Sequence, residues 1–141
     1  MRLIPVALAL FYRTPSPEIL EVWTQKREDD GIYHGLQEFP GGGIEQNESP
    51  LEAAVREVEE EVGIQINPDE GKFMGIYTNS FPGKTILLNV ILFPEQKALS
   101  GKGEWLKIDK TNLSSLYQEK IPGPNHQMID DLYRSLYSVI K

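Results

Sequence analysis

Three glutamates close together in the chain carry the side chains that hard metal ions prefer. Glu57, Glu60 and Glu61 are three and four residues apart, so a helix places them on one face. Glu59 falls outside that face. Crowded carboxylates repel one another or take up protons unless a cation lies between them. The spacing therefore fits either a divalent metal site or a solvated acidic helix face.

The residues before the glutamates predict a close backbone approach and then a helix. Positions 41–43 are all glycine, which lets the chain approach a ligand or a metal and exposes amide and carbonyl groups. A capping box with proline in the first helical position runs from Ser49 to Glu52, and Gly63 is a natural helix end. We therefore expect a glycine loop followed by a helix, Pro50–Val62, whose apolar face packs on a sheet. That face carries Leu51, Ala54, Val55, Val58 and Val62.

The segment that contains these features resembles the Nudix box. The box is a glycine, five residues, a glutamate, seven residues, Arg-Glu-aliphatic, one residue, Glu-Glu, one residue and Gly-aliphatic. Every fixed position is present: Gly42, Glu48, Arg56-Glu57-Val58, Glu60-Glu61 and Gly63-Ile64. The resemblance implies an α/β fold, an α/β/α sandwich with a mixed sheet between helices. It also implies that Glu57, Glu60 and Glu61 bind magnesium or manganese.

The other fixed residues of the box are expected to support the catalytic helix. By helical spacing alone, Arg56 could pair with Glu52 and Glu60. The resemblance instead makes Arg56 and Glu48 orienting partners within the box. The residues with this supporting role are Gly42, Glu48, Arg56 and Gly63.

Further residues resemble the MutT-like subgroup, whose members hydrolyse nucleoside triphosphates to monophosphate and pyrophosphate. Residues 38–42 read Glu-Phe-Pro-Gly-Gly, as in that subgroup. The resemblance implies that the carbonyl group of Gly41 is an additional metal ligand. Arg27 lies where the subgroup has an arginine that contacts phosphate, so we expect it to bind substrate and to assist catalysis.

Two residues are candidates for contact with a nucleobase. The turn Pro122–Asn125 resembles the one whose asparagine reads the purine in MutT-like proteins, and a side-chain amide can donate and accept together. Asn125 could equally be the N-cap of the last helix. Phe81 could stack on a base, although aromatic residues on strands more often pack in the core.

The chain departs from the MutT-like pattern at two places. Gly43 replaces a lysine, so a charge that faces phosphate is absent; Lys26 or Lys84 takes its place, or both are plain surface residues. A further glutamate ligand, which that subgroup supplies from a later loop, has no secure match, and Glu104 is our candidate. We expect either Glu57 or Glu104 to accept the proton of the attacking water.

Apolar and alternating runs predict the elements that position these residues. A turn at Thr14–Pro17 separates the first two strands, a polar loop covers Lys26–His34, and the last helix runs from about Asn125 to Ile140. Strands with helices between and after them predict a mixed sheet flanked by helices. The strands are expected at Leu3–Tyr12, Glu18–Gln25, Gly35–Phe39, Lys72–Ser80, Lys84–Phe93 and Trp105–Ile108.

Length and composition limit the class of protein. A chain of 141 residues suits one domain, expected to span residues 1–141, and the absence of cysteine excludes disulfides and thiolate metal sites. The net charge of −7 argues against unaided binding to nucleic acid or to an anionic membrane. Leu3–Tyr12 reads as a buried strand rather than a signal peptide, and no stretch approaches the ~20 apolar residues of a membrane span. We expect a cytoplasmic monomer or homodimer whose partner is a small nucleotide.

The sequence therefore predicts a metal-dependent hydrolase that cuts a phosphoanhydride bond. Water is expected to attack phosphorus directly, because the chain has no cysteine and no serine in a nucleophile-elbow pattern. RNA 5′ ends, ADP-ribose and dinucleoside polyphosphates are alternative substrates. A non-catalytic nucleotide-binding domain is a further alternative, against which the crowded glutamates argue.

Overall fold

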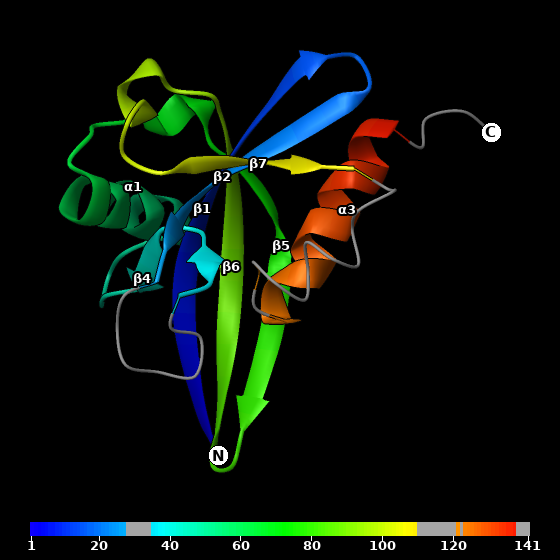
Figure 1. Ribbon diagram of the computed structural model, residues 1–141. Coiled ribbons are helices and arrows are strands. Elements are labelled where there is room, and N and C mark those ends of the chain that lie inside the picture. Colours follow the sequence, from blue (N-terminus) through cyan, green and yellow to red (C-terminus); the bar gives the residue numbers. More distant parts are fainter. Residues whose placement is uncertain (28–34, 110–120, 122, 138–141) are drawn as a thin grey trace.

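A mixed sheet lies between two helices in the computed structural model shown in Figure 1. The structure describes residues 1–27, 35–109, 121 and 123–137. Helix α1, Pro50–Val62, packs on one face of the sheet, and helix α3, His126–Tyr137, packs on the other. The predicted α/β/α sandwich is confirmed. The strands are β1 Arg2–Ser16, β2 Ile19–Lys26, β3 Gln37–Glu38, β4 Gly41–Gly43, β5 Lys72–Phe81, β6 Lys84–Pro94 and β7 Glu104–Ile108.

The sheet is built around β1. Its strand order is β3-β2-β1-β6-β5, with β4 also paired to β1 and β7 paired to β2. β1 runs parallel to β6, where Leu3 lies opposite Thr85 and Leu10 opposite Leu92. The other pairings of the described strands are antiparallel. This combination makes the sheet mixed, as predicted.

β1 is apolar on both faces because each face meets a helix. Ala7, Ala9 and Phe11 belong to the core beneath α1, whereas Leu8 and Leu10 belong to the core beneath α3. Successive residues of a strand point to opposite faces, so a strand covered on both sides has an unbroken apolar run. That run positions β1 at the centre of the molecule.

Helix α1 forms as its sequence predicts. The side chain of Ser49 accepts the Glu52 N–H at 3.1 Å, and the Glu52 carboxylate accepts the Ser49 N–H at 2.8 Å, which completes the capping box. Gly63 ends the helix with a φ of 81°, a conformation that favours glycine. The predicted apolar face is confirmed, since Ala54, Val58 and Val62 are buried and Leu51 and Val55 pack against the same core.

The three glycines form a strand, not the predicted loop. β4 pairs antiparallel with β1 and places Gly42 opposite Ala7. A Cβ on Gly41 would collide with the carbonyl oxygen of Ala7 and the side chain of Leu8, so only glycine lets the chain lie this close to β1. The pairing fixes the backbone of β4 in front of α1.

The first hairpin turns later than predicted. β1 continues to Ser16, which still pairs with Ile19, so the turn lies at residues 17 and 18 instead of beginning at Thr14. Most of the predicted loop Lys26–His34 lies outside the described residues.

The last helix also begins later than predicted. Asn125 is the final residue of a short 3-10 turn, Gly123–Asn125, and α3 starts at His126. The predicted end of this helix, at Ile140, lies outside the described residues. No helix in the described part of the chain is long and apolar enough to span a membrane.

Candidate active site

A cavity of about 380 Å³ opens beside β4. We call it the central cavity. β1 and β6 supply an apolar floor of Val6, Leu8, Ile86 and Leu88. An apolar pocket with a few convergent polar groups is the usual form of a small-molecule site. The predicted site residues that line it are Arg27, Gly41, Gly42, Glu61, Phe81 and Asn125.

Glu61 reaches the cavity from the last turn of α1. Its Oε1 accepts the N–H of Gly41 at 3.0 Å. Partial desolvation against β4 raises the pKa of Glu61 above its ordinary value although the residue is exposed, and the hydrogen bond from Gly41 opposes this rise. Neighbouring carboxylates raise the pKa further: Glu57, Glu38 and Glu60. A carboxyl group in such surroundings is stabilised as an anion when a cation binds beside it.

Glu57 lies between α1 and β4. A Cβ on Gly42 would lie 2.5–2.7 Å from the carboxyl atoms of Glu57, so glycine at this position makes room for the carboxylate. On its other side, Nη1 of Arg56 donates to Oε2 of Glu57 at 3.0 Å. The side chain of Glu57 is only 14% exposed. Its packing against Gly42 and the hydrogen bond from Arg56 hold it in place.

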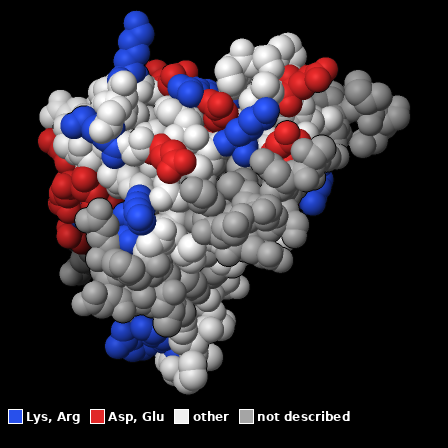
Figure 2. Space-filling view, in the orientation of Figure 1, with Lys and Arg blue, Asp and Glu red and all other residues white. Residues whose placement is uncertain are grey.

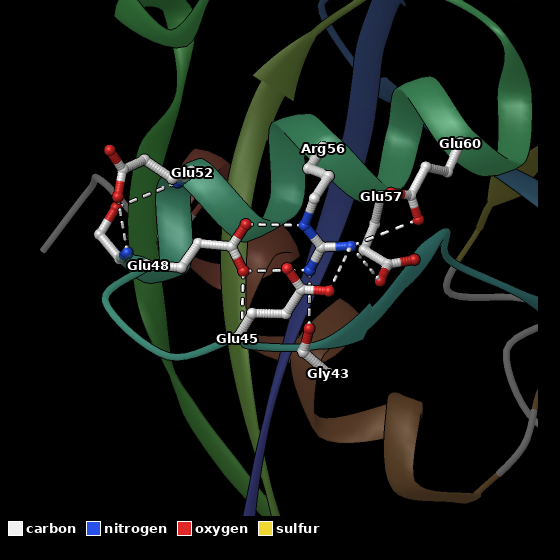
Figure 3. Close-up of polar contacts among 8 residues, drawn as sticks. Gly43, Glu45, Glu48, Glu52, Arg56, Glu57 and Glu60 are labelled. Atoms are coloured by element: carbon white, nitrogen blue, oxygen red, sulfur yellow. Dashed lines mark hydrogen bonds and ion pairs between the residues drawn. The ribbon is translucent and has the colours of Figure 1, made fainter.

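Arg56 is the centre of the polar network drawn in Figure 3. It binds Glu48 through two hydrogen bonds, 2.7 Å from Nε and 3.0 Å from Nη2. Nη2 also donates to the carbonyl oxygen of Gly43 at 2.9 Å. Nη1 reaches Oε1 of Glu60 at 3.3 Å, as helical spacing allows. Arg56 thus joins α1 to β4 and to the loop that carries Glu48.

The protonation equilibria follow this network. Hydrogen bonds from Arg56 lower the pKa of Glu48, and the N–H of Glu45 lowers it further. The hydrogen bond to Glu48 raises the pKa of Arg56 above its ordinary value. Glu52 forms the capping box instead of the ion pair with Arg56 that helical spacing allowed.

The carboxylates are close to one another but do not form a closed cage. Among the residues that the structure describes, no three Asp, Glu or His side chains lie close enough together to hold a metal ion. The donor set of Glu57, Glu60 and Glu61 consists of carboxylate oxygens, which fits a hard divalent cation. Binding of one ion by all three carboxylates would therefore require these side chains to rotate, and Glu60, 58% exposed, has room to do so.

Arg27 lies at the cavity beside β3. Its Nη1 donates to Oε1 of Glu38 at 2.8 Å, and both residues line the cavity. Its backbone N–H and carbonyl group bond to Leu36 and Gly35. These contacts hold the guanidinium group at the cavity wall, while 36% of the side chain remains exposed.

Two asparagines and the ring of Phe81 also line the cavity. Asn125 is 8% exposed, and Asn79 and Phe81 are half-buried on the same face of β5. Lys84 holds its Nζ 5.3 Å from the centre of the Phe81 ring. Sequence reasoning missed Asn79. Its position two residues before Phe81 on a predicted strand was the available signal, since such residues share a face.

Glu104 lies outside the central cavity. It begins β7 opposite Thr24 and lines a second hollow of about 340 Å³. Its Oε1 accepts a hydrogen bond from Nε2 of Gln37 at 3.1 Å. Lys26 lines the same second hollow, and Gln25 lines both. The structure therefore does not bring Glu104 and Lys26 together with the glutamates of α1.

Comparison with known proteins places the chain in a family. The sequence model of the NUDIX domain matches residues 3–119. The 8-oxo-dGTP diphosphatase of Escherichia coli strain K12 is 33% identical over 119 residues, which are 81% of this chain and 87% of that protein. The chain therefore belongs to the NUDIX family, and the Nudix prediction is confirmed.

Two further comparisons agree with this family. The 8-oxo-dGTP diphosphatase of Proteus vulgaris is 38% identical over 63 residues, 45% of this chain, and the match spans about half of that protein, 54%. The crystal structure of a MutT protein from Methanosarcina mazei Go1 has the same fold, with a TM-score of 0.71 and 21% identity. That match covers 96% of each chain. Nudix hydrolases generally need divalent metal ions.

Proposed function

We propose that this chain hydrolyses a nucleoside triphosphate, or a related derivative of a nucleoside diphosphate, to a nucleoside monophosphate and pyrophosphate. One observation supports the proposal above others. The carboxylates of Glu57 and Glu61 pack against two glycines of β4, Gly42 and Gly41, that line the same cavity as Arg27 and Asn125. Acidic groups, the guanidinium group of Arg27 and an apolar pocket are thus adjacent.

The substrate divides between two parts of the cavity. Its base lies on the apolar floor beside Phe81 and Asn125, where an amide can pair with a purine edge. Its phosphates lie toward Arg27, whose planar guanidinium group suits phosphate oxygens. This arrangement places the phosphate chain beside β4 and the glutamates of α1.

Magnesium or manganese completes the site. We propose that Glu57, Glu60 and Glu61 hold the ion, together with the carbonyl oxygen of Gly41. A bound divalent cation neutralises phosphate oxygens and lowers the pKa of water. Glu57 is better placed than Glu104 to accept the proton of the attacking water, because its carboxyl group packs against Gly42, which lines the cavity, whereas Glu104 lies in the second hollow. Gly42, Glu48, Arg56 and Gly63 support these positions.

Hydrolysis in oxygen-18 water with identification of both products tests the reaction. The substrates to be compared are purine and pyrimidine nucleoside triphosphates, 8-oxo-dGTP, ADP-ribose, a dinucleoside polyphosphate and triphosphorylated RNA. 8-oxo-dGTP is included because two relatives are named as 8-oxo-dGTP diphosphatases. With a nucleoside triphosphate we expect the oxygen-18 label in pyrophosphate, from attack on the β-phosphorus. We expect no turnover when EDTA removes the metal ion. Label in the monophosphate would mean attack on the α-phosphorus, and orthophosphate as the sole product would rule out this reaction.

Variants of α1 test the role of the glutamates. Glu60→Gln and Glu61→Gln each remove a ligand charge and should lower turnover by about a hundredfold or more with the fold intact. Glu59→Gln is the matched control, because Glu59 is exposed and its carboxylate bonds to Gln65 instead of facing β4. Equal activity in all three variants would contradict the metal site.

A further inference from the structure

One edge of the sheet is open. β5 ends the strand order, and in the described part of the chain no backbone hydrogen bond joins its outer edge to another segment. Ile76 lies opposite Asn89, which in turn lies opposite Ala7 of the core beneath α1. Ile76 therefore faces the same side of the sheet as α1. The core beneath α1 contains no residue of β5, so the helix does not cover this strand.

Large apolar side chains are exposed on this uncovered part of the sheet. Ile76 is 56% exposed, Phe73 is 53% exposed and Leu3 is 62% exposed. Phe73 lies opposite Ile91, another residue of the core beneath α1, and Leu3 shares a row of the sheet with Ser80 of β5. We call Leu3, Phe73 and Ile76 the open apolar face. Exposed apolar groups beside a free strand edge mark an interaction site.

The strands that carry the open apolar face have no carboxylate. None of the 21 acidic residues of the chain lies in residues 1–17 or 71–94, which form β1, β5 and β6. In Figure 2 no red atom is visible on the described part of the tip at the bottom, where Figure 1 places the N-terminus. Two chains of net charge −7 repel each other, so self-association favours a face without carboxylates.

The composition of β5 indicates which partner fits its edge. Residues 73–81 contain neither a charge nor a proline, the residues that commonly protect an edge strand. A bulge between Phe73 and Gly75 protects one end, but Gly75–Phe81 pairs regularly with β6. Residues 73–81 therefore offer no charge of their own to attract an acidic or basic peptide. The edge fits an uncharged apolar strand, and the same strand of a second copy has that composition.

We propose that this chain forms a symmetric dimer in which the outer edges of two β5 strands pair antiparallel and the two open apolar faces adjoin. The sheet then continues from one copy into the other, and the free backbone groups of both edges are satisfied. The dimer also stabilises one wall of the central cavity, because Asn79 and Phe81 belong to β5. The proposal is independent of the reaction that the cavity performs.

Sedimentation equilibrium of the full chain tests the dimer. We expect wild-type protein to approach twice the chain mass of 16.0 kDa as concentration rises. Ile76→Lys and Thr78→Lys place charges on the exposed side chains of the pairing strand and should each weaken association by about tenfold or more. Ala98→Lys is the matched control, because it adds the same charge at an exposed position of the 3-10 turn Lys97–Leu99.

A single engineered thiol tests the geometry. The chain has no cysteine, so Thr78→Cys carries one thiol at the middle of Gly75–Phe81. A short bifunctional thiol reagent should link two Thr78→Cys chains and leave Ala98→Cys chains unlinked. Thermal unfolding confirms that each variant folds. A wild-type chain that stays monomeric, a dimer that both lysine variants leave intact, or equal crosslinking of the two thiol variants would each overturn the proposal.

Discussion

The carboxyl group of Glu57 occupies the space in which any side chain at position 42 would lie. A Cβ on Gly42 would approach the carboxyl carbon and one oxygen to 2.5 Å. The glycine is therefore needed for the position of a carboxylate on another element, and not for a turn. The next glycine differs, because a Cβ on Gly43 would meet no atom within 4 Å.

This relationship predicts different effects for neighbouring substitutions. Gly42→Ala should displace the Glu57 carboxylate and lower turnover by about tenfold or more, since a shift of about 1 Å in a catalytic group can cost that much. Gly43→Ala should keep nearly full activity. Steady-state kinetics of both variants with saturating metal ion measures the difference. Equal losses would show that the carboxylate of Glu57 does not need its present position.

The ion pair between Arg56 and Glu48 predicts a positioning role for Glu48. Glu48→Gln removes the negative charge that fixes Arg56 through two hydrogen bonds. Arg56 should then hold Glu57 less firmly. Turnover should fall by about tenfold, in the range found for residues that orient a metal ligand, with the apparent affinity for the metal ion reduced as well. Glu45→Gln is the control, because its contact with Arg56 is 3.8 Å long and its side chain is 69% exposed. A similar loss in both variants would assign the effect to net charge alone.

The raised pKa of Glu61 predicts that this residue destabilises the metal-free protein. The pKa of this carboxyl group is higher in the folded than in the unfolded chain. Such a group stabilises the fold at pH values below its pKa in the unfolded chain, and this stabilisation is lost as the pH rises through its pKa in the folded chain. Without metal, Glu61→Gln should therefore be more stable than wild type at neutral pH, and the two should converge as the pH falls below the ordinary value of 4.5. Thermal unfolding between acid and neutral pH in EDTA measures this, with Glu59→Gln as control. A variant less stable than wild type at neutral pH would contradict the cause assigned here.

The hydrogen bond from Tyr77 to Asp131 joins β5 to α3 and predicts the opposite pH dependence. Burial raises the pKa of Asp131, but hydrogen bonds from Tyr77 and Gln127 outweigh it, so the pKa is lowered overall. The resulting stability is present above the ordinary pKa of 3.8 and is lost as pH falls through the folded value. Tyr77→Phe should lower the free energy of unfolding at neutral pH by about 1 kcal/mol after solvent screening.

Denaturant unfolding at several pH values checks this prediction. The difference between Tyr77→Phe and wild type should shrink in acid, where Asp131 is protonated. Tyr12→Phe is the control, since the structure gives the Tyr12 hydroxyl no hydrogen bond among the described residues. A difference that stays constant with pH would assign the loss to packing.

The local sequence predicted the helix that carries the glutamates, because its signals are short-range. Capping box, proline and terminal glycine all act within one turn of the residues that they order. The helical face of Glu57, Glu60 and Glu61 followed from spacing alone. The direction in which each carboxylate points did not follow from the sequence. Contacts with Gly41, Gly42 and Arg56 determine it, and they join different elements of the fold.

Long-range pairing explains what the sequence did not predict. The three glycines read as a loop, since glycine lowers strand propensity, but the neighbouring β1 binds them as β4. Glu104 was the candidate for a further glutamate ligand from a later loop, and the sequence alone does not show which side chains a strand pairing brings together. The pairing of β7 with β2 places Glu104 beside Gln37 instead.

The burial of Asn125 at the central cavity predicts that this residue selects the base. An amide donates and accepts together, so it can pair with a purine edge that an apolar floor alone would not distinguish. Asn125→Ala should raise KM for the preferred nucleotide and reduce the preference between bases, with a smaller effect on kcat. Asn125→Asp has the same size but has lost the donor, and it should also lower the preference. Steady-state kinetics with a purine and a pyrimidine triphosphate separates base recognition from folding. If Asn125 only supports the start of α3, both substitutions would lower the melting temperature and leave the ratio of the two kcat/KM values unchanged.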